Sequence, residues 1–242
     1  MIGIGFIAAV TTWVGLPTPA GSEEERDPTL ESVMEALARS GGVEARFRES
    51  RQLTILSKPI ESSGMLYFSP PDWLARHVTE PSVAKVIVRD DRVFFQDETG
   101  SQTLELGSSE LARAMVGNVI FLMRGDLGAL RSQYEVDFST SRGLWTLDLE
   151  PRDRVMRQLV ERLEVIGKND QLVRMQSIET SGDVTLTEFE EVKVGVEFSS
   201  EELEAIFSTR PAGARVPSTE SDSPVATESN IGASAPTGQT SP

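Results

Sequence analysis

Residues 64–81 read GMLYFSPPDWLARHVTEP, and this segment predicts two β-strands joined by a proline corner. Pro70 and Pro71 have a fixed φ angle and no N–H to donate, so they do not fit inside a hydrogen-bonded strand. Side chains alternate between the two faces of each strand, and apolar groups fall on both faces. On the first strand Gly64, Leu66 and Phe68 alternate with Met65 and Tyr67, and on the second strand Leu74, Arg76 and Val78 alternate with Trp73, Ala75 and His77.

A small antiparallel sheet normally buries one face and exposes the other to water. The sheet predicted around residues 64–81 therefore needs a second apolar partner. Three partners would satisfy it: the chain's own helices, another subunit, or a ligand.

Composition removes several classes of function. The chain has 242 residues and a formal net charge of −15 at pH 7, so repulsion disfavours a nucleic-acid partner. It has no cysteine, which excludes zinc–thiolate sites, disulfides and a cysteine nucleophile. A bacterial lipoprotein carries its lipid on a cysteine, so we expect the mature protein to be free of a lipid anchor.

Both ends of the chain are expected to lie outside the folded domain. Residues 2–16 are mostly apolar and precede the small-x-small sequence Thr18-Pro19-Ala20, which predicts a signal-peptide-like segment over residues 1–20. The apolar run is shorter than the roughly 20 residues that span a bilayer, and its alternative interpretation is a core strand or an N-terminal anchor. We expect an acidic linker at 21–27, one domain at 28–208, and a disordered tail at 209–242, which is poor in apolar residues.

Within the domain, hydrophobic periodicity predicts helices and many strands of an α+β fold with an antiparallel meander. The predicted helices are 29–39, 109–123 and 127–131, the last capped by Asp126, and a final ordered piece is expected at 201–207. Besides the two strands above, the predicted strands are 43–56, 84–89, 93–96, 102–106, 134–139, 144–149, 160–166, 172–179 and 184–194.

No catalytic constellation is recognisable. The single histidine, His77, lies in a strand with no nucleophile motif beside it, and a packed or surface role is favoured. The chain has no second histidine for a metal site, and its paired glutamates resemble solvated charge runs. We therefore expect no enzyme activity, no cofactor and no metal.

The residues of this domain resemble the periplasmic lipoprotein carrier family, LolA and its relatives, from residue 29 to about residue 198. The resemblance is carried by Ala45-x-Phe47, Gly64-x-Leu66, Pro71 and the run His77-Val78-Thr79-Glu80-Pro81. It is stronger for LolA-related proteins of aryl polyene or xanthomonadin pigment clusters, through Ser62-Ser63-Gly64, Pro71-Asp72-x-Leu74, Gly125-Asp126-Leu127 and Trp145-Thr146-Leu147.

The resemblance implies an unclosed antiparallel β-barrel, or half-barrel, whose apolar concave face is covered by helices. It also implies a monomeric carrier in the periplasm, exported, not lipidated and not transmembrane. Such a carrier shields lipid or acylated cargo, between an inner-membrane donor and an outer-membrane acceptor. The cargo stays open between lipoprotein acyl chains and an apolar pigment or polyketide conjugate. The competing hypothesis is an envelope interaction or assembly protein whose apolar face binds a partner protein.

If the chain is a carrier, the period-two strand faces and the stripe of helix 109–123 predict the cavity residues. They are Phe47, Leu66, Phe68, Leu74, Val78, Leu111, Met115 and Val119. The arginine that holds the lid in the family falls at Pro70 in this chain. Arg76, on the same face as Leu74 and Val78, is the candidate for a lid or mouth role.

Overall fold

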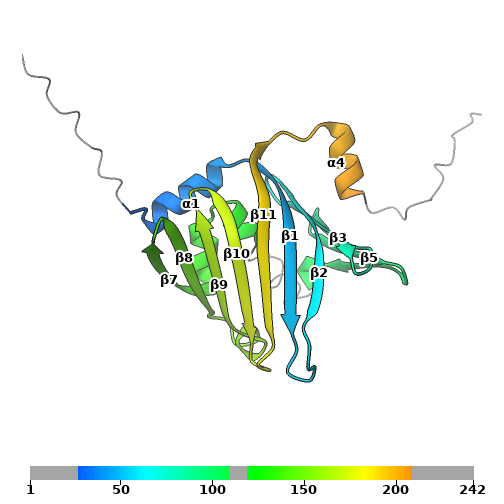
Figure 1. The fold of residues 1–242 in the computed structure, drawn as a ribbon. Coiled ribbons are helices and arrows are strands. Elements are labelled where there is room, and N and C mark those ends of the chain that lie inside the picture. The colour runs from blue at the N-terminus through cyan, green and yellow to red at the C-terminus, as the bar shows by residue number, and fades with distance from the viewer. Residues whose placement is uncertain (1–26, 109–118, 209–242) are drawn as a thin grey trace, which may run out of the picture. The chain divides into compact units, whose positions relative to one another are not determined.

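The computed structural model describes residues 27–108 and 119–208. The signal-peptide-like segment (1–20), nearly all of the acidic linker, the first part of helix 109–123 and the tail (209–242) lie outside the described residues. Eleven strands form one antiparallel sheet in the order β6-β5-β4-β3-β2-β1-β11-β10-β9-β8-β7 (Figure 1). Two meanders are therefore joined through the long pair β1–β11, and in the described part of the chain β6 and β7 remain the two free edges. This is the predicted half-barrel.

The described elements follow the predicted ones closely. The helices are α1 (Leu30–Arg39), α3 (Leu127–Gln133) and α4 (Ser200–Phe207), residues 119–123 are helical, and short 3₁₀ turns occur at η1 (Leu106–Ser108) and η2 (Met156–Gln158). The strands are β1 (Gly42–Gln52), β2 (Ile60–Ser69), β3 (Trp73–Glu80), β4 (Ala84–Arg89), β5 (Arg92–Asp97), β6 (Gly100–Glu105), β7 (Tyr134–Ser141), β8 (Leu144–Pro151), β9 (Val160–Lys168), β10 (Gln171–Glu179) and β11 (Val184–Val196).

Local side-chain hydrogen bonds explain where several elements begin and end. Thr29 caps α1 through a capping box with Ser32, and Asp126 caps α3 by accepting from the Ala129 N–H. The first strand is shorter than predicted, because the chain turns after Gln52 instead of continuing to residue 56. The Gln52 side chain donates to the carbonyls of residues 53 and 56, which closes this turn.

Helices cover part of the concave face of the sheet. Figure 1 shows α1 crossing one end of the sheet, near the start of β1. Its apolar stripe is buried in one core cluster with residues of β1, β2, β8 and β9 and with the helical residues 119–123, and α3 joins the same core through Leu130. The buried stripe of α1 comprises Leu30, Val33, Met34 and Leu37. The chain's own helices are thus one of the apolar partners that the sheet required.

The opposite, convex face of β3 and β4 is covered by α4. Phe207 is fully buried against Ala75 and Ile87, and its ring centroid lies 5.4 Å from that of Trp73. Two side chains hold the end of the helix: His77 donates from Nε2 to the Ile206 carbonyl at 2.9 Å, and Arg89 donates to the Phe207 carbonyl at 3.0 Å. The second apolar face is therefore also covered by the chain itself.

The position of His77 also affects its protonation. Burial lowers the pKa of His77 below its ordinary value, and the nearby Lys85 lowers it further, while the bond to the Ile206 carbonyl acts in the other direction. The neutral imidazole is thus favoured beneath α4. In the described residues, no helix has the length and apolar character needed to cross a bilayer.

Candidate functional site

A cavity of about 510 Å³ lies on the concave face, at the end of the sheet away from α1. It lies between β1, β2 and β3 on one side and β9, β10 and β11 on the other, with η2 and residue 119 also contributing. The lining residues are Phe47, Glu49, Arg51, Leu66, Arg76, Val119, Met156, Leu159, Val160, Leu163, Met175, Ser177, Glu179, Thr185, Thr187 and Phe189. Its volume is within the range of sites that enclose one small organic molecule.

The inner part of this cavity is apolar because one face of β1 continues onto one face of β11. Phe47 pairs directly with Phe189 across the two strands, and Leu66 lies on the same side of β2. Met175 pairs with Thr187 and Val165, while Leu163 pairs with Ser177. These positions give the inner part a lining of aromatic, leucine and methionine side chains, and methionine is adaptable in shape.

An ion pair marks the change from the apolar part to the polar part. Arg76 Nη2 lies 2.9 Å from Glu49 Oε1, and the two side chains are only 30% and 19% exposed. The guanidinium carbon of Arg76 lies 4.3 Å from the centroid of the Phe47 ring, which adds a cation–π contact. Thr187 Oγ1 donates to the other oxygen of Glu49 at 3.1 Å. The geometry of the Arg76 contact is that of an ion pair and not of an aligned hydrogen bond.

A second ion pair lies nearer to solvent. Arg51 Nη2 is 3.4 Å from Glu179 Oε1, and both side chains line the cavity. The hydroxyl residues Ser177 and Thr185 lie opposite each other on β10 and β11 at the same end. We call this end of the cavity the mouth.

Exposed apolar side chains occur in the β1–β2 connection and beside η2, next to strand ends that line the cavity. Ile55 is 86% exposed, and Leu56, Ile60, Val155 and Leu159 are exposed as well; these five residues are called the mouth rim. Hydrogen bonds join its segments, because the Thr54 N–H donates to Asp183 Oδ1 at 2.7 Å and the Thr180 N–H donates to the Leu159 carbonyl at 3.1 Å. The Thr54 N–H also holds the pKa of Asp183 below its ordinary value. The mouth rim is a connected part of the fold.

The structure brings four of the predicted site residues together. Phe47, Leu66 and Val119 line the cavity, and Arg76 lines it beside Glu49. Phe68 and Leu74 are buried in the packed core nearer to α1, and Val78 packs against that core without lining the cavity. Leu111 and Met115 lie outside the described residues.

Twelve of the sixteen described lining residues were absent from the sequence-based expectation. The lining residues on β9, β10, β11 and η2 were not named, although the period-two pattern was available to find them. Met175, Ser177 and Glu179 share one face of β10, as Thr185, Thr187 and Phe189 share one face of β11. What the pattern does not supply is the pairing of β11 with β1, which brings these faces together.

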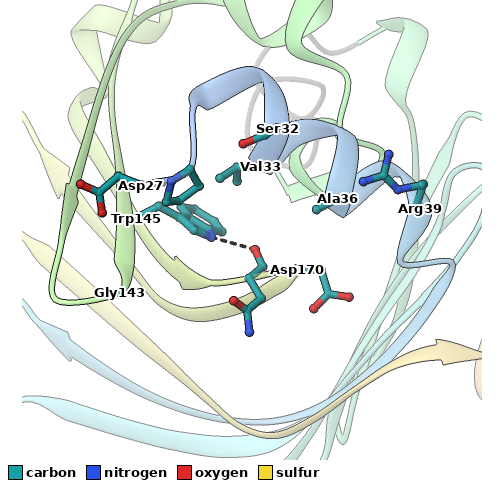
Figure 2. A pocket seen from close by; sticks show the side chains of 10 residues that line it. Asp27, Ser32, Val33, Ala36, Arg39, Gly143, Trp145 and Asp170 are labelled. Atoms are coloured by element: carbon teal, nitrogen blue, oxygen red, sulfur yellow. Dashed lines mark hydrogen bonds between the residues drawn. The ribbon is translucent and has the colours of Figure 1, made fainter. Parts of the chain in front are cut away.

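A second hollow, of about 560 Å³, lies beside the start of α1 (Figure 2). Figure 2 shows Ser32, Ala36 and Arg39 of α1 on one side of it and Trp145 and Asp170 on the other. Trp145 is 1% exposed and donates to the Asn169 carbonyl at 2.9 Å, so little of its ring is exposed in the hollow. The charged lining makes this hollow a poorer ligand site than the concave cavity, whose apolar walls enclose a few polar groups.

In the described part of the chain, no group of three or more histidine, cysteine, aspartate or glutamate side chains is arranged to hold a metal ion. The concave cavity contains no histidine, cysteine or lysine among its described lining residues. Its charged groups are paired arginines and carboxylates, and its remaining polar groups are hydroxyls.

A family model described as "outer membrane lipoprotein carrier protein LolA-like" matches residues 21–192, which includes the fold from α1 into β11. No protein of curated function matches the sequence.

Solved structures with a similar course of the chain include a LolA superfamily protein from Nitrosomonas europaea. The two sequences are 10% identical, the match covers 73% of this chain and 97% of that chain, and the TM-score is 0.42. A putative outer membrane lipoprotein-sorting protein domain from Vibrio parahaemolyticus has 10% identity, coverage of 75% and 98%, and a TM-score of 0.42. The lipoprotein LppX from Mycobacterium tuberculosis has 12% identity, coverage of 72% and 100%, and a TM-score of 0.37.

Proposed function

We propose that this chain, which belongs to the outer membrane lipoprotein carrier LolA-like family, is a periplasmic carrier that shields the acyl part of a lipid-like cargo and delivers it towards the outer membrane. The observation that supports the proposal is the cavity of about 510 Å³ enclosed by one face of the sheet. Phe47, Leu66 and Val119, together with the β9–β11 lining, would contact the acyl chain.

The cavity supplies the energy that such a carrier needs. Each buried methylene contributes about 0.8 kcal/mol, so a chain of ten to twelve methylenes contributes about 8–10 kcal/mol before the cost of ordering it. The sheet provides a rigid wall, since the β1–β11 pair runs along the whole cavity. The cavity would bind cargo without a large change in the strands.

The finer parts of the proposal concern processing and cargo. We propose that residues 1–20 are removed on export, that residues 28–208 form the carrier domain, and that the tail after residue 209 is dispensable for stability. The cargo would be a lipoprotein acyl group, a lipid or an aryl polyene conjugate. We propose that the protein acts as a monomer without a cofactor and without catalysis.

A competing function is favoured by the mouth rim. Exposed apolar side chains such as Ile55, at 86% exposure, are typical of surfaces that contact another protein or a lipid phase. In this alternative the chain is an envelope interaction or assembly protein, its apolar surface binds a partner protein stably, and no ligand is exchanged.

Purification from a bacterial periplasm followed by solvent extraction and mass spectrometry separates the two functions. The carrier proposal predicts a co-purified lipid in a molar ratio near one, and saturable binding of the apolar dye N-phenyl-1-naphthylamine that the extracted lipid reverses. Dye that never binds, together with a protein partner that stays bound through purification, would establish the alternative. The mass of the periplasmic protein tests removal of residues 1–20.

A further inference from the structure

We infer that the concave cavity selects a single-chain amphiphile with an uncharged, hydrogen-bonding head group, of the monoacylglycerol type, over the free fatty acid of the same chain length. The inference rests on the proposed carrier function and specifies its ligand. It also predicts that a second acyl chain does not fit.

The charges that face the cavity are already balanced. Its described lining holds two arginines and two carboxylates, and each arginine has its own partner: Arg76 with Glu49 at 2.9 Å, and Arg51 with Glu179 at 3.4 Å. Thr187 further fixes Glu49 by donating to its second oxygen. An anionic head group would have to displace a carboxylate from an arginine or lie desolvated beside one. Either route costs binding free energy that a neutral head group does not lose.

The same region offers hydrogen bonds to a neutral head group. Ser177 and Thr185 face each other across β10 and β11, and within the described residues neither hydroxyl has a side-chain hydrogen-bond partner. The Arg76 Nη2 group is itself buried against Glu49, so the two hydroxyls are the polar groups of this region that a head group can reach. An ester carbonyl followed by free hydroxyls matches this arrangement, because it both donates and accepts without carrying charge.

The volume of the cavity matches one acyl chain. A methylene occupies roughly the volume of a water molecule in the liquid, about 30 Å³, so about 510 Å³ accommodates roughly 17 such groups. That corresponds to one chain of about 14 carbons with part of its head group. Two chains of that length would need about twice the volume.

Displacement of N-phenyl-1-naphthylamine from the purified protein tests the inference. The competitors are 1-monomyristoylglycerol, myristate and dimyristoylglycerol at pH 8, each below its aggregation concentration. We expect monomyristoylglycerol to bind about tenfold more tightly than myristate, since one unscreened charge contact is worth at least that factor. Dimyristoylglycerol is expected to displace the dye more weakly still.

The variant Glu49→Gln removes one carboxylate and leaves Arg76 unpaired. We expect it to raise the affinity for myristate about tenfold and to change that for monomyristoylglycerol less than threefold, so that the preference is lost. Glu190→Gln is the matched control, because Glu190 pairs with Arg48 at 3.3 Å and is not a lining residue of the cavity. Thr185→Val is a second variant, expected to weaken the monoacylglycerol several-fold and to leave myristate unchanged.

The outcomes separate the inference from the function on which it rests. If neither the dye nor any of the lipids binds, the carrier function itself fails. If the lipids bind but myristate matches or exceeds monomyristoylglycerol, the carrier function stands and the head-group inference is overturned. Equal binding of dimyristoylglycerol would overturn the single-chain limit.

Discussion

A large side chain placed on the cavity wall tests whether the cavity is a ligand site. Ser177 lies on β10 between its cross-strand neighbours Leu163 and Thr185, and all three line the cavity. The substitution Ser177→Phe places a ring in this space. We expect the protein to fold with unchanged or higher stability and to lose its affinity for acyl ligands.

The expected loss follows from the volume that the ring removes. Phenylalanine has about five more side-chain heavy atoms than serine, so it excludes about four to five methylenes of the ligand, worth about 3–4 kcal/mol at 0.8 kcal/mol each. Since about 1.4 kcal/mol corresponds to a factor of ten, affinity should fall at least about a hundredfold. The ring meanwhile covers apolar wall from Leu163, which favours the folded state.

The assay combines thermal unfolding by circular dichroism with a titration of N-phenyl-1-naphthylamine. Gln176→Phe is the matched control, because Gln176 is the next residue on β10, points to the other face and does not line the cavity. The control should bind the dye normally. If the space is in truth packed, Ser177→Phe would instead destabilise the protein by about 1–3 kcal/mol through overpacking, and this result would refute the reasoning.

Three further predictions concern the convex face and its strands. Phe207→Ala removes a fully buried ring and should lower the free energy of α4 docking by about 3–5 kcal/mol, which is measured as rapid amide exchange over residues 200–207. The control Phe95→Ala changes a side chain that is 39% exposed and should leave that exchange slow. Burial lowers the pKa of His77 in the folded protein, so the stability that this residue contributes is complete above about pH 6.5 and declines as the pH falls towards the lower folded-state pKa. His77→Gln should flatten this part of the stability–pH curve. An unchanged slope would contradict the lowered pKa of His77. Gly64→Ala would place a Cβ 1.9 Å from the His77 carbonyl oxygen and should lower stability by about 2–3 kcal/mol in denaturant unfolding, whereas Gly107→Ala, with no atom within 4 Å, should be neutral.

The strands were predictable because their signal is local. Alternation of side chains and the turn residues between strands depend on neighbours in sequence, and both gave the order of elements and the antiparallel meander. The half-barrel itself was implied by the resemblance to the LolA family. The first strand was predicted too long because residues 53–56 are apolar enough to extend it. The turn is closed by the Leu56 N–H, which donates to the Leu53 carbonyl, and by the Gln52 side chain, and a hydrophobicity pattern detects neither.

The site was only partly predictable because its walls come from distant parts of the chain. Phe47, Leu66 and Arg76 follow one another on consecutive strands, so a meander places them together. Phe189 reaches Phe47 only through the β1–β11 pair, whose register no local pattern determines. The position of α4 also depends on contacts between distant parts of the chain. Its order was expected, but its docking on the convex face depends on the packing of Phe207 against β3 and β4.

One face of β1 explains why the protein has both a core and a cavity. In order along the strand this face carries Val43, Ala45, Phe47, Glu49 and Arg51. The first three are buried, and the α1 end of the face is filled by Leu37 and Met123. The last two belong to ion pairs that line the open end.

If this face of β1 were apolar throughout, the open end would expose a continuous apolar groove, which favours aggregation or a permanent partner. The ion pairs make this end polar, and each charge is balanced by a partner of opposite sign. Phe47 is the point of change: its ring faces the apolar lining and also carries the Arg76 guanidinium 4.3 Å from its centre. A ligand that follows this gradient must place its chain against the apolar lining around Phe47 and its polar end towards the ion pairs, so the direction of binding is set by the order of residues along a single strand.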